Sequence, residues 1–125
     1  MFSENLTRRV LAFSFFYNIF GTLVFLFPGQ LGTASGLPVD APFLHNSFIA
    51  ANILLFGLVA GWLSRRHPID LPLLTVFGIL KVTFFVLMLI AGLRHEVTAL
   101  GVLGAGVDLA MGVIFLGHAW QSSRR

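Results

Sequence analysis

Lys81 and Asp108 are the two residues of this chain whose charges lie deep inside long apolar segments. Lys81 is in the middle of residues 71–93, LPLLTVFGILKVTFFVLMLIAGL, and Asp108 is within residues 97–120. A charged side chain at the centre of a bilayer costs about 3 kcal/mol on insertion scales, so each residue needs a partner. We therefore predict that Lys81 and Asp108 pair with each other between two transmembrane helices.

Two amide side chains are expected at the same depth in the membrane. Asn18 and Asn52 lie in two other apolar segments. At about 1.5 Å per residue, these amides, Lys81 and Asp108 all fall roughly 12 to 18 Å from one membrane face, which predicts a single polar layer. Such a layer suits a proton or ion site, or a pocket for the polar head of a ligand. The plainer alternative is hydrogen bonding that only joins helices, at about 0.6 kcal/mol per bond.

Four apolar segments must position these residues. We expect transmembrane helices at about residues 10–28, 43–63, 71–93 and 97–120, with a polar start at 1–9 and an exposed loop of turn-forming residues at 29–42. Hydrophobic residues make up 57% of the 125 residues and charged residues only 10%, which is typical of polytopic membrane proteins. The segments lack the alternation of a membrane β-barrel. The prediction is an all-α integral membrane four-helix bundle, a single domain over residues 1–125.

Two features of the spans predict how they are arranged. The connections after the second and third spans are very short, so spans two, three and four are expected to be sequential antiparallel neighbours. Four spans also place both termini on one side, and that side carries six arginines against Arg94 alone on the other. The six are Arg8, Arg9, Arg65, Arg66, Arg124 and Arg125. The positive-inside rule then predicts cytoplasmic termini in a bacterial inner membrane.

The same six arginines explain the basic character of the chain. The formal net charge is +3, but the basic residues flank apolar spans instead of forming one stripe, which excludes nucleic acid as a partner. At the inner surface of a membrane they are candidates for contact with lipid head groups. Membrane lipids are therefore the first partners that the sequence predicts.

The fourth span has a face of small residues around Asp108. The residues expected to pack against another helix are Gly101, Gly104, Ala105 and Gly112. Small side chains allow two helices to approach closely, and close approach is what brings Lys81 within reach of Asp108. We therefore expect Gly104→Leu or Ala105→Leu to disrupt the bundle more than Leu116→Phe.

Metal and cofactor sites are not expected. The chain has no cysteine, which excludes disulfides, thiolate metal sites and iron–sulfur clusters. Its histidines are spread over different ends of the expected spans, so none pair at metal-binding spacing: His45, His67, His95 and His118. No nucleophile or phosphate-binding motif occurs either, so we predict no enzymatic activity.

Short motifs follow one another along nearly the whole chain. They are Tyr17-Asn18-x-x-Gly21, the basic turn Arg65-Arg66-His67-Pro68, Gly78-x-x-Lys81 and Asp108-Leu109. This set resembles a family of small, uncharacterised bacterial membrane proteins with four spans. Span count and size also resemble, more distantly, the DoxX-like four-helix membrane proteins. In the first family, the sequence at the acid of the fourth span is similar to Asn-Asp. This chain has Val107 in place of the asparagine. The resemblance implies the fold but no reaction.

The favoured prediction is a polytopic inner-membrane protein that acts as a homo-oligomer or as an accessory subunit of a larger membrane complex. Almost the whole chain is transmembrane, so its lipid-facing helices are the surface available for assembly. Two alternatives stay open: a small proton- or ion-coupled transporter that uses the buried Lys–Asp layer, and a binder of a lipid or quinone. Access of water discriminates the transporter from the favoured prediction, because a transporter needs Lys81 and Asp108 to be reachable from one side, whereas a purely structural pair is sealed by Phe, Leu and Gly neighbours.

Overall fold

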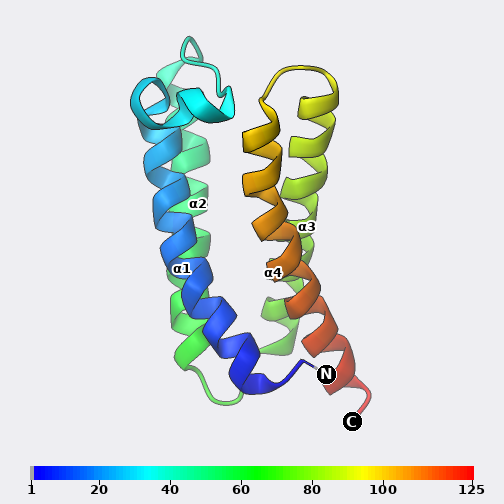
Figure 1. Ribbon diagram of the computed structural model, residues 1–125. Helices are drawn as coiled ribbons and strands as arrows, with labels where there is room; N and C mark the ends of the chain where they lie inside the picture. The colour runs from blue at the N-terminus through cyan, green and yellow to red at the C-terminus, as the bar shows by residue number, and fades with distance from the viewer. Residues whose placement is uncertain (1) are drawn as a thin grey trace.

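The computed structural model describes residues 2–125, and that part of the chain contains four long helices (Figure 1). They are α1 (Glu4–Leu26), α2 (Phe43–Arg65), α3 (Leu71–Leu93) and α4 (Ala99–Ser123). Each is long and apolar enough to cross a membrane. Both ends of the chain lie at one end of the bundle, which we call the terminal end. The opposite end, where residues 27–42 connect α1 to α2, is called the loop end.

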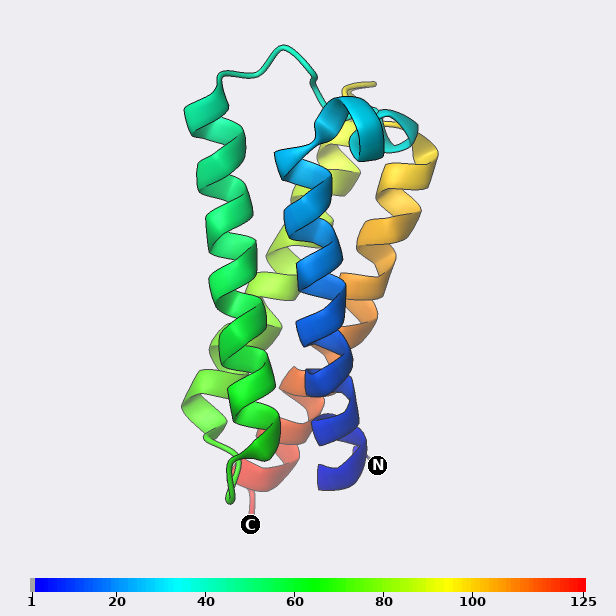
Figure 2. The same ribbon diagram turned by 90° about the vertical axis from the view of Figure 1, so that its left-hand side faces the viewer.

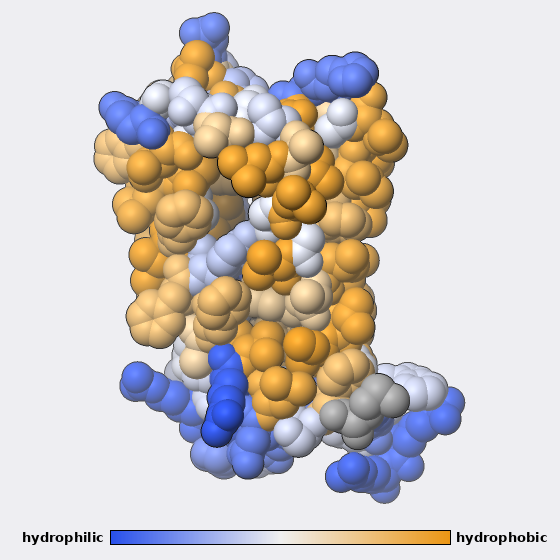
Figure 3. Space-filling view, in the orientation of Figure 1, coloured by the Kyte–Doolittle hydropathy of each residue, from blue (hydrophilic) through white to orange (hydrophobic). Residues whose placement is uncertain are grey.

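The surface of the bundle is apolar around its middle. Figure 3 shows hydrophobic residues along the helices and hydrophilic ones gathered at the two ends. On α1 the side chains of Phe13, Phe16 and Phe20 are 51%, 66% and 58% exposed. A continuous apolar surface of this kind is stable in lipid and unstable in water. The chain is therefore a multi-pass membrane protein.

The helices pack as two antiparallel pairs, α1 with α2 and α3 with α4. Figure 2 shows the α1–α2 pair in front of the α3–α4 pair, and the closest backbone approach between the pairs is that of α1 to α4. Helices α2 and α3 meet through side chains, as in the edge-to-face rings of Phe56 and Phe77, whose centroids lie 5.7 Å apart. Spans two, three and four were predicted to be sequential antiparallel neighbours: α3 and α4 do form a close pair, whereas α2 and α3 are in contact through side chains without close backbone packing.

Glycines determine which helices approach closely. A Cβ added to Gly57 of α2 would lie 2.7 Å from the Cβ of Asn18 on α1. A Cβ added to Gly112 of α4 would lie 3.0 Å from the carbonyl oxygen of Gly78 on α3. These distances leave no room for a side chain, so the glycines allow the backbones of each pair to touch. Gly57 and Gly61 have the GxxxG spacing, a signal in the sequence that our prediction did not use.

Helix α1 begins at Glu4, so most of the polar start predicted at residues 1–9 is helical. The Ser3 hydroxyl accepts a hydrogen bond from the backbone N–H of Leu6 at 3.1 Å and caps the helix. The loop predicted at 29–42 is also partly helical, with a π-helical turn at Pro28–Gly32 and a 3₁₀ turn at Thr33–Ser35. In both places the prediction took polar residues and turn formers as signs of irregular structure. Such residues also occur in short helical segments, because caps and local hydrogen bonds can satisfy the backbone N–H and C=O groups there.

The two halves of the bundle are packed differently. Near the terminal end, nine buried hydrophobic residues from all four helices and the α2–α3 turn form one core. They are Leu11, Ala60, Leu63, Ile69, Leu74, Phe77, Met111, Phe115 and Ala119. The half towards the loop end contains a cavity, which lies beside the predicted polar residues.

Candidate functional site

Lys81 is the centre of a buried polar cluster that joins three helices. Its Nζ donates hydrogen bonds to Oδ1 of Asp108 on α4 and to Oδ1 of Asn18 on α1, both at 2.7 Å. Lys81 and Asp108 are each 5% exposed, and Asn18 is 7% exposed. The structure therefore brings together three of the four residues of the predicted polar layer, and the resulting contacts bridge the two helix pairs.

Close helix packing positions the members of this cluster. Gly112 lies against Lys81, since a Cβ on this glycine would be 3.2 Å from the Cβ of the lysine. Asn18 packs on Gly57, and its Nδ2 donates to the carbonyl oxygen of Ile53 on α2 at 3.1 Å. That bond fixes the amide so that its oxygen faces the ammonium group. Lys81 and Asn18 are thus each held by contact with a neighbouring helix.

Asn52 does not join the cluster. Its Nδ2 donates to the carbonyl oxygen of Phe48 on its own helix at 2.8 Å. The count of residues along the span predicts only its depth, and the structure shows no hydrogen bond from Asn52 to Lys81, Asp108 or Asn18 among the described residues. Asn52 lines the adjacent cavity instead.

Tyr17 lies beside the cluster, although the sequence analysis did not assign it to the site. Its hydroxyl donates to the carbonyl oxygen of Gly104 on α4, and its ring centroid lies 5.9 Å from Nζ of Lys81. Attraction between a cation and an aromatic ring extends to about this distance. The signal in the sequence was a tyrosine next to Asn18 in an otherwise apolar segment.

An apolar cavity of about 350 Å³ lies between the helix pairs, next to the cluster. All four helices line it, and most of its wall is aromatic or aliphatic, as at Phe84 and Met88. The strongly polar residues of its wall are the three members of the cluster, Asn18, Lys81 and Asp108, together with Tyr17 and Asn52. Figure 3 shows the bundle hollowed between α1 and α4, in the half towards the loop end.

The connection between α1 and α2 lies across the end of this cavity. Ser35 and Leu37 from this connection line the cavity. The carbonyl oxygen of Ser35 accepts from the backbone N–H of Thr98 at 3.0 Å, and that of Ala34 accepts from the Thr98 hydroxyl at 2.7 Å. These bonds tie the connection to the start of α4. The visible opening is therefore the gap between α1 and α4, on the side of the bundle that faces lipid.

The predicted helix-packing residues of α4 lie in several environments. Gly112 packs on α3, whereas a Cβ on Gly101 would lie 2.8 Å from the carbonyl oxygen of Ser35 in the loop. Ala105 is 3% exposed and lines the cavity. Gly104 also lines the cavity, and the nearest atom to a Cβ there is the Tyr17 hydroxyl oxygen at 3.8 Å.

These environments change the expected effects of bulky substitutions. Since Gly104 lines the cavity and a Cβ there would meet no atom closer than 3.8 Å, we no longer expect Gly104→Leu to separate two helices, because the larger side chain can enter the cavity. Leu116 was chosen as a tolerant position, but its side chain and backbone pack on Gly78 of α3. Exposed Val113 is the better comparison on this helix, with 49% of its surface accessible.

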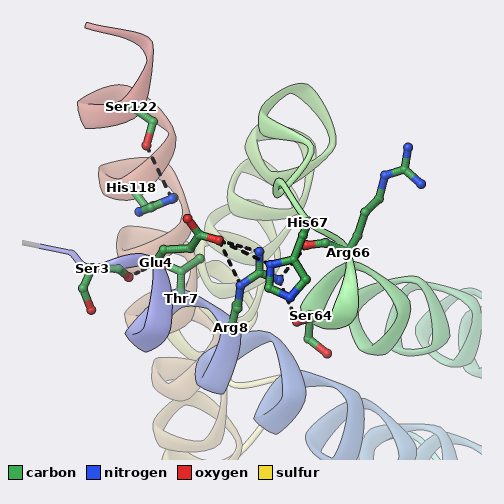
Figure 4. Close-up of polar contacts among 9 residues, drawn as sticks. All are labelled: Ser3, Glu4, Thr7, Arg8, Ser64, Arg66, His67, His118 and Ser122. Atoms are coloured by element: carbon green, nitrogen blue, oxygen red, sulfur yellow. Dashed lines mark hydrogen bonds and ion pairs between the residues drawn. The ribbon is translucent and has the colours of Figure 1, made fainter. Parts of the chain in front are cut away.

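The six arginines predicted at one membrane surface do lie at the terminal end of the bundle, but they differ in their contacts. The guanidinium group of Arg8 donates to the carbonyl oxygens of Ser64 at 2.9 Å and Arg66 at 2.6 Å, and to the carboxylate of Glu4 (Figure 4). The Arg8 side chain is only 13% exposed, so it joins α1 to the end of α2. The other five are exposed: Arg9, Arg65, Arg66, Arg124 and Arg125.

Histidines near the same end make protein contacts. Nδ1 of His118 lies 2.8 Å from the carbonyl oxygen of Phe2. Nδ1 of His67 lies 4.0 Å from the carboxylate of Glu4 (Figure 4). Within residues 2–125, no three side chains of His, Cys, Asp or Glu are placed to hold a metal ion.

Comparison with known proteins finds no relative: no protein family model, curated protein or solved structure matches the chain. The chain is thus a small membrane protein with four candidate spans and no identified family. Its function has to be inferred from the geometry of the cluster and the cavity.

Proposed function

We propose that this protein binds an amphipathic molecule that is dissolved in the membrane. The polar head of the molecule lies against Lys81, Asn18 and Asp108, and its apolar part fills the cavity. The observation that supports this proposal is an apolar cavity of about 350 Å³ with a compact polar group on its wall. Small-molecule sites in proteins have this size and this character, with a few polar groups that fix the orientation of the ligand.

The location of the ion pair favours binding over simple helix adhesion. A buried ion pair is stabilised best when protein surrounds it and satisfies all of its hydrogen bonds. Here Lys81 and Asp108 both line the cavity instead of being enclosed on every side. An ammonium group has three N–H donors, and the structure shows partners for two of them. A ligand head group supplies the missing partner.

The proposal also includes the membrane in which the protein lies and its orientation there. We place the termini in the cytoplasm and the bundle in a bacterial inner membrane, because arginines gather at the terminal end while the loop end carries Arg94. This is a binding function without a catalytic step. The proposal thus adopts the binder of a lipid or quinone, one of the alternatives from the sequence, in preference to a role in assembly. For assembly, the exposed phenylalanines of α1 remain the candidate surface.

One observation favours a second candidate, the proton- or ion-coupled transporter. The cavity reaches the Lys81–Asp108 pair from the half towards the loop end, while the core fills the other half with residues such as Leu63 and Phe115, both 0% exposed. Alternating access requires that the pair be reached from one membrane face only in each state, so this candidate also requires the α1–α2 connection to move from the end of the cavity. The two candidates differ in whether the cavity holds water.

Cysteine labelling in membrane vesicles separates these two candidates. The chain has no cysteine, so Ala105→Cys places a single thiol in the cavity. Val39→Cys in the loop, where the native side chain is 54% exposed, is the matched control. A cavity filled by an apolar ligand protects the first thiol from a water-soluble thiol reagent. Labelling of both thiols at similar rates favours the transporter.

Native mass measurement tests the binding proposal itself. The parent protein, extracted in mild detergent, should carry a bound small molecule that organic solvent releases. Gly104→Phe should lose it, because the ring enters the cavity, while Leu103→Phe on the lipid side, where the native leucine is 72% exposed, should keep it. Equal occupancy in Gly104→Phe and the parent contradicts binding in this cavity.

A further inference from the structure

The chemistry of the cavity specifies the head group of its ligand, on the premise of the proposed function that an amphiphile binds there. Of the residues that line the cavity, the charged ones are Lys81 and Asp108. Their charges are opposite, and Nζ lies 2.7 Å from Oδ1. The net charge of the lining is therefore zero.

A neutral lining selects against charged head groups. An anionic head group near Lys81 would also lie near the carboxylate of Asp108, and a cationic one near Asp108 would face the ammonium group. A charge in an apolar environment needs its own counter-charge, and here each candidate counter-charge is already used. The two charged groups at the cavity thus favour a ligand head with no net charge.

The pair has one free N–H donor, on Nζ of Lys81, and one carboxylate oxygen of Asp108 that accepts no hydrogen bond from the described residues. Nζ of Lys81 uses two of its three donors on Asn18 and Asp108. The carboxylate of Asp108 accepts through Oδ1, and its Oδ2 has no hydrogen bond within residues 2–125. A hydroxyl group can accept from the ammonium group and donate to the carboxylate at the same time. A carbonyl group can only accept, and would leave the carboxylate oxygen without a donor.

The volume of the cavity limits the size of the part that is enclosed. At about 30 Å³ per non-hydrogen group, taken from the volume of a water molecule in the liquid, a space of about 350 Å³ corresponds to roughly 12 non-hydrogen atoms, and this space is open on one side. One alkyl chain of moderate length or one substituted ring fits this space. Two acyl chains of a phospholipid do not, although one longer chain can extend through the gap between α1 and α4.

We propose that the cavity binds a neutral alcohol with one apolar chain. Its hydroxyl group bridges Nζ of Lys81 and the carboxylate of Asp108, and its chain runs along Phe84 and Met88 towards the opening. Asn18 is a positioning residue in this site, since it fixes the ammonium group from α1. The recognition depends on the pair remaining charged, which distinguishes it from filling of the cavity by any apolar molecule.

A set of probes with the same chain tests the head-group specificity. The parent protein in phosphatidylcholine nanodiscs is loaded with tritiated 1-decanol, and displacement by unlabelled 1-decanol, decanoate, decylammonium and decane is measured. At about pH 8.5 the carboxylate and the ammonium probes are both charged. Gly104→Phe, with its cavity filled, gives the background from partition into lipid.

The proposal predicts that 1-decanol displaces the label with an apparent Kd about tenfold lower than that of any other probe. Tighter binding of decanoate or decylammonium overturns the neutral-head inference and leaves the proposed function intact. Equal binding of decane overturns the role of the hydroxyl group. Parent protein with no 1-decanol binding above the Gly104→Phe background overturns the neutral-alcohol inference, and it refutes the proposed function as well if native mass measurement finds no bound molecule.

Discussion

Replacing Asp108 by asparagine tests whether the buried ion pair holds the bundle together. The substitution keeps the shape of the side chain but removes the negative charge 2.7 Å from Nζ of Lys81. Removing one partner of a buried pair costs about 3 to 5 kcal/mol, because the other charge remains without compensation. We expect a loss near the lower end, about 3 kcal/mol, since Asn18 and the new amide oxygen still accept hydrogen bonds from the ammonium group.

The double variant Lys81→Met with Asp108→Leu separates charge from packing. It removes both charges, so it should regain most of the stability that Asp108→Asn loses. Asp40→Asn, at an exposed loop position, is the matched control and should change stability by less than about 0.5 kcal/mol. The folded fraction of each variant is followed by circular dichroism during a denaturant titration in mild detergent.

Two outcomes would refute this reasoning. If Asp108→Asn is as stable as the parent, Asp108 is already protonated or is hydrated from the cavity, and the transporter becomes the better interpretation. If the double variant is no more stable than Asp108→Asn, the loss comes from packing instead of from an uncompensated charge.

Three further substitutions or fusions test other parts of the structure. Reporters fused after Arg125 and inserted into residues 29–42 should report cytoplasm and exterior, respectively, and the reverse pattern would invert the proposed orientation. Gly112→Leu should lower the unfolding temperature far more than Val113→Leu, because it places a side chain against the α3 backbone; equal temperatures would mean that α3 and α4 do not touch there. Arg8→Ala should cost about 2 kcal/mol through loss of its bonds to the Ser64 and Arg66 carbonyls, measured by the same titration, while exposed Arg9→Ala should be nearly neutral.

The parts of the fold that depend on hydropathy could be predicted from the sequence. The expected third span has the same bounds as α3, and α2 begins at the expected residue. The contact between Lys81 and Asp108 could be predicted as well, since two opposite charges in apolar segments have few other partners. Both inferences rest on the cost of exposing polar groups to lipid, which does not require knowledge of how the helices pack.

The parts that depend on rotation and pairing of the helices could not be predicted in the same way. Counting residues predicts the depth of Asn52, but the direction of its side chain depends on which face of α2 packs against α1. Short connections predicted antiparallel neighbours but not which of them pack backbone to backbone, and glycines such as Gly57 and Gly112 give that close packing to α1–α2 and α3–α4. The cavity is a property of the packed bundle, and no single segment of the sequence carries a signal for it.

The binding of Arg8 to the end of α2 shows the same limit. Near a predicted membrane surface, an arginine is expected to face lipid head groups or water. Only the packed structure brings the Ser64 and Arg66 carbonyl oxygens within hydrogen-bonding distance of it.

Photo-cross-linking tests the central claim, that the cavity holds an amphiphile from the membrane. A single-chain alcohol with a diazirine near the end of its tail is added to membranes that contain the protein, and the modified residues are identified by peptide mass analysis. The claim predicts adducts at cavity residues such as Phe84 and Met88, which excess 1-decanol prevents and Gly104→Phe abolishes. Adducts confined to lipid-facing residues such as Leu87 and Leu103, at the same level in the parent and in Gly104→Phe, would contradict it.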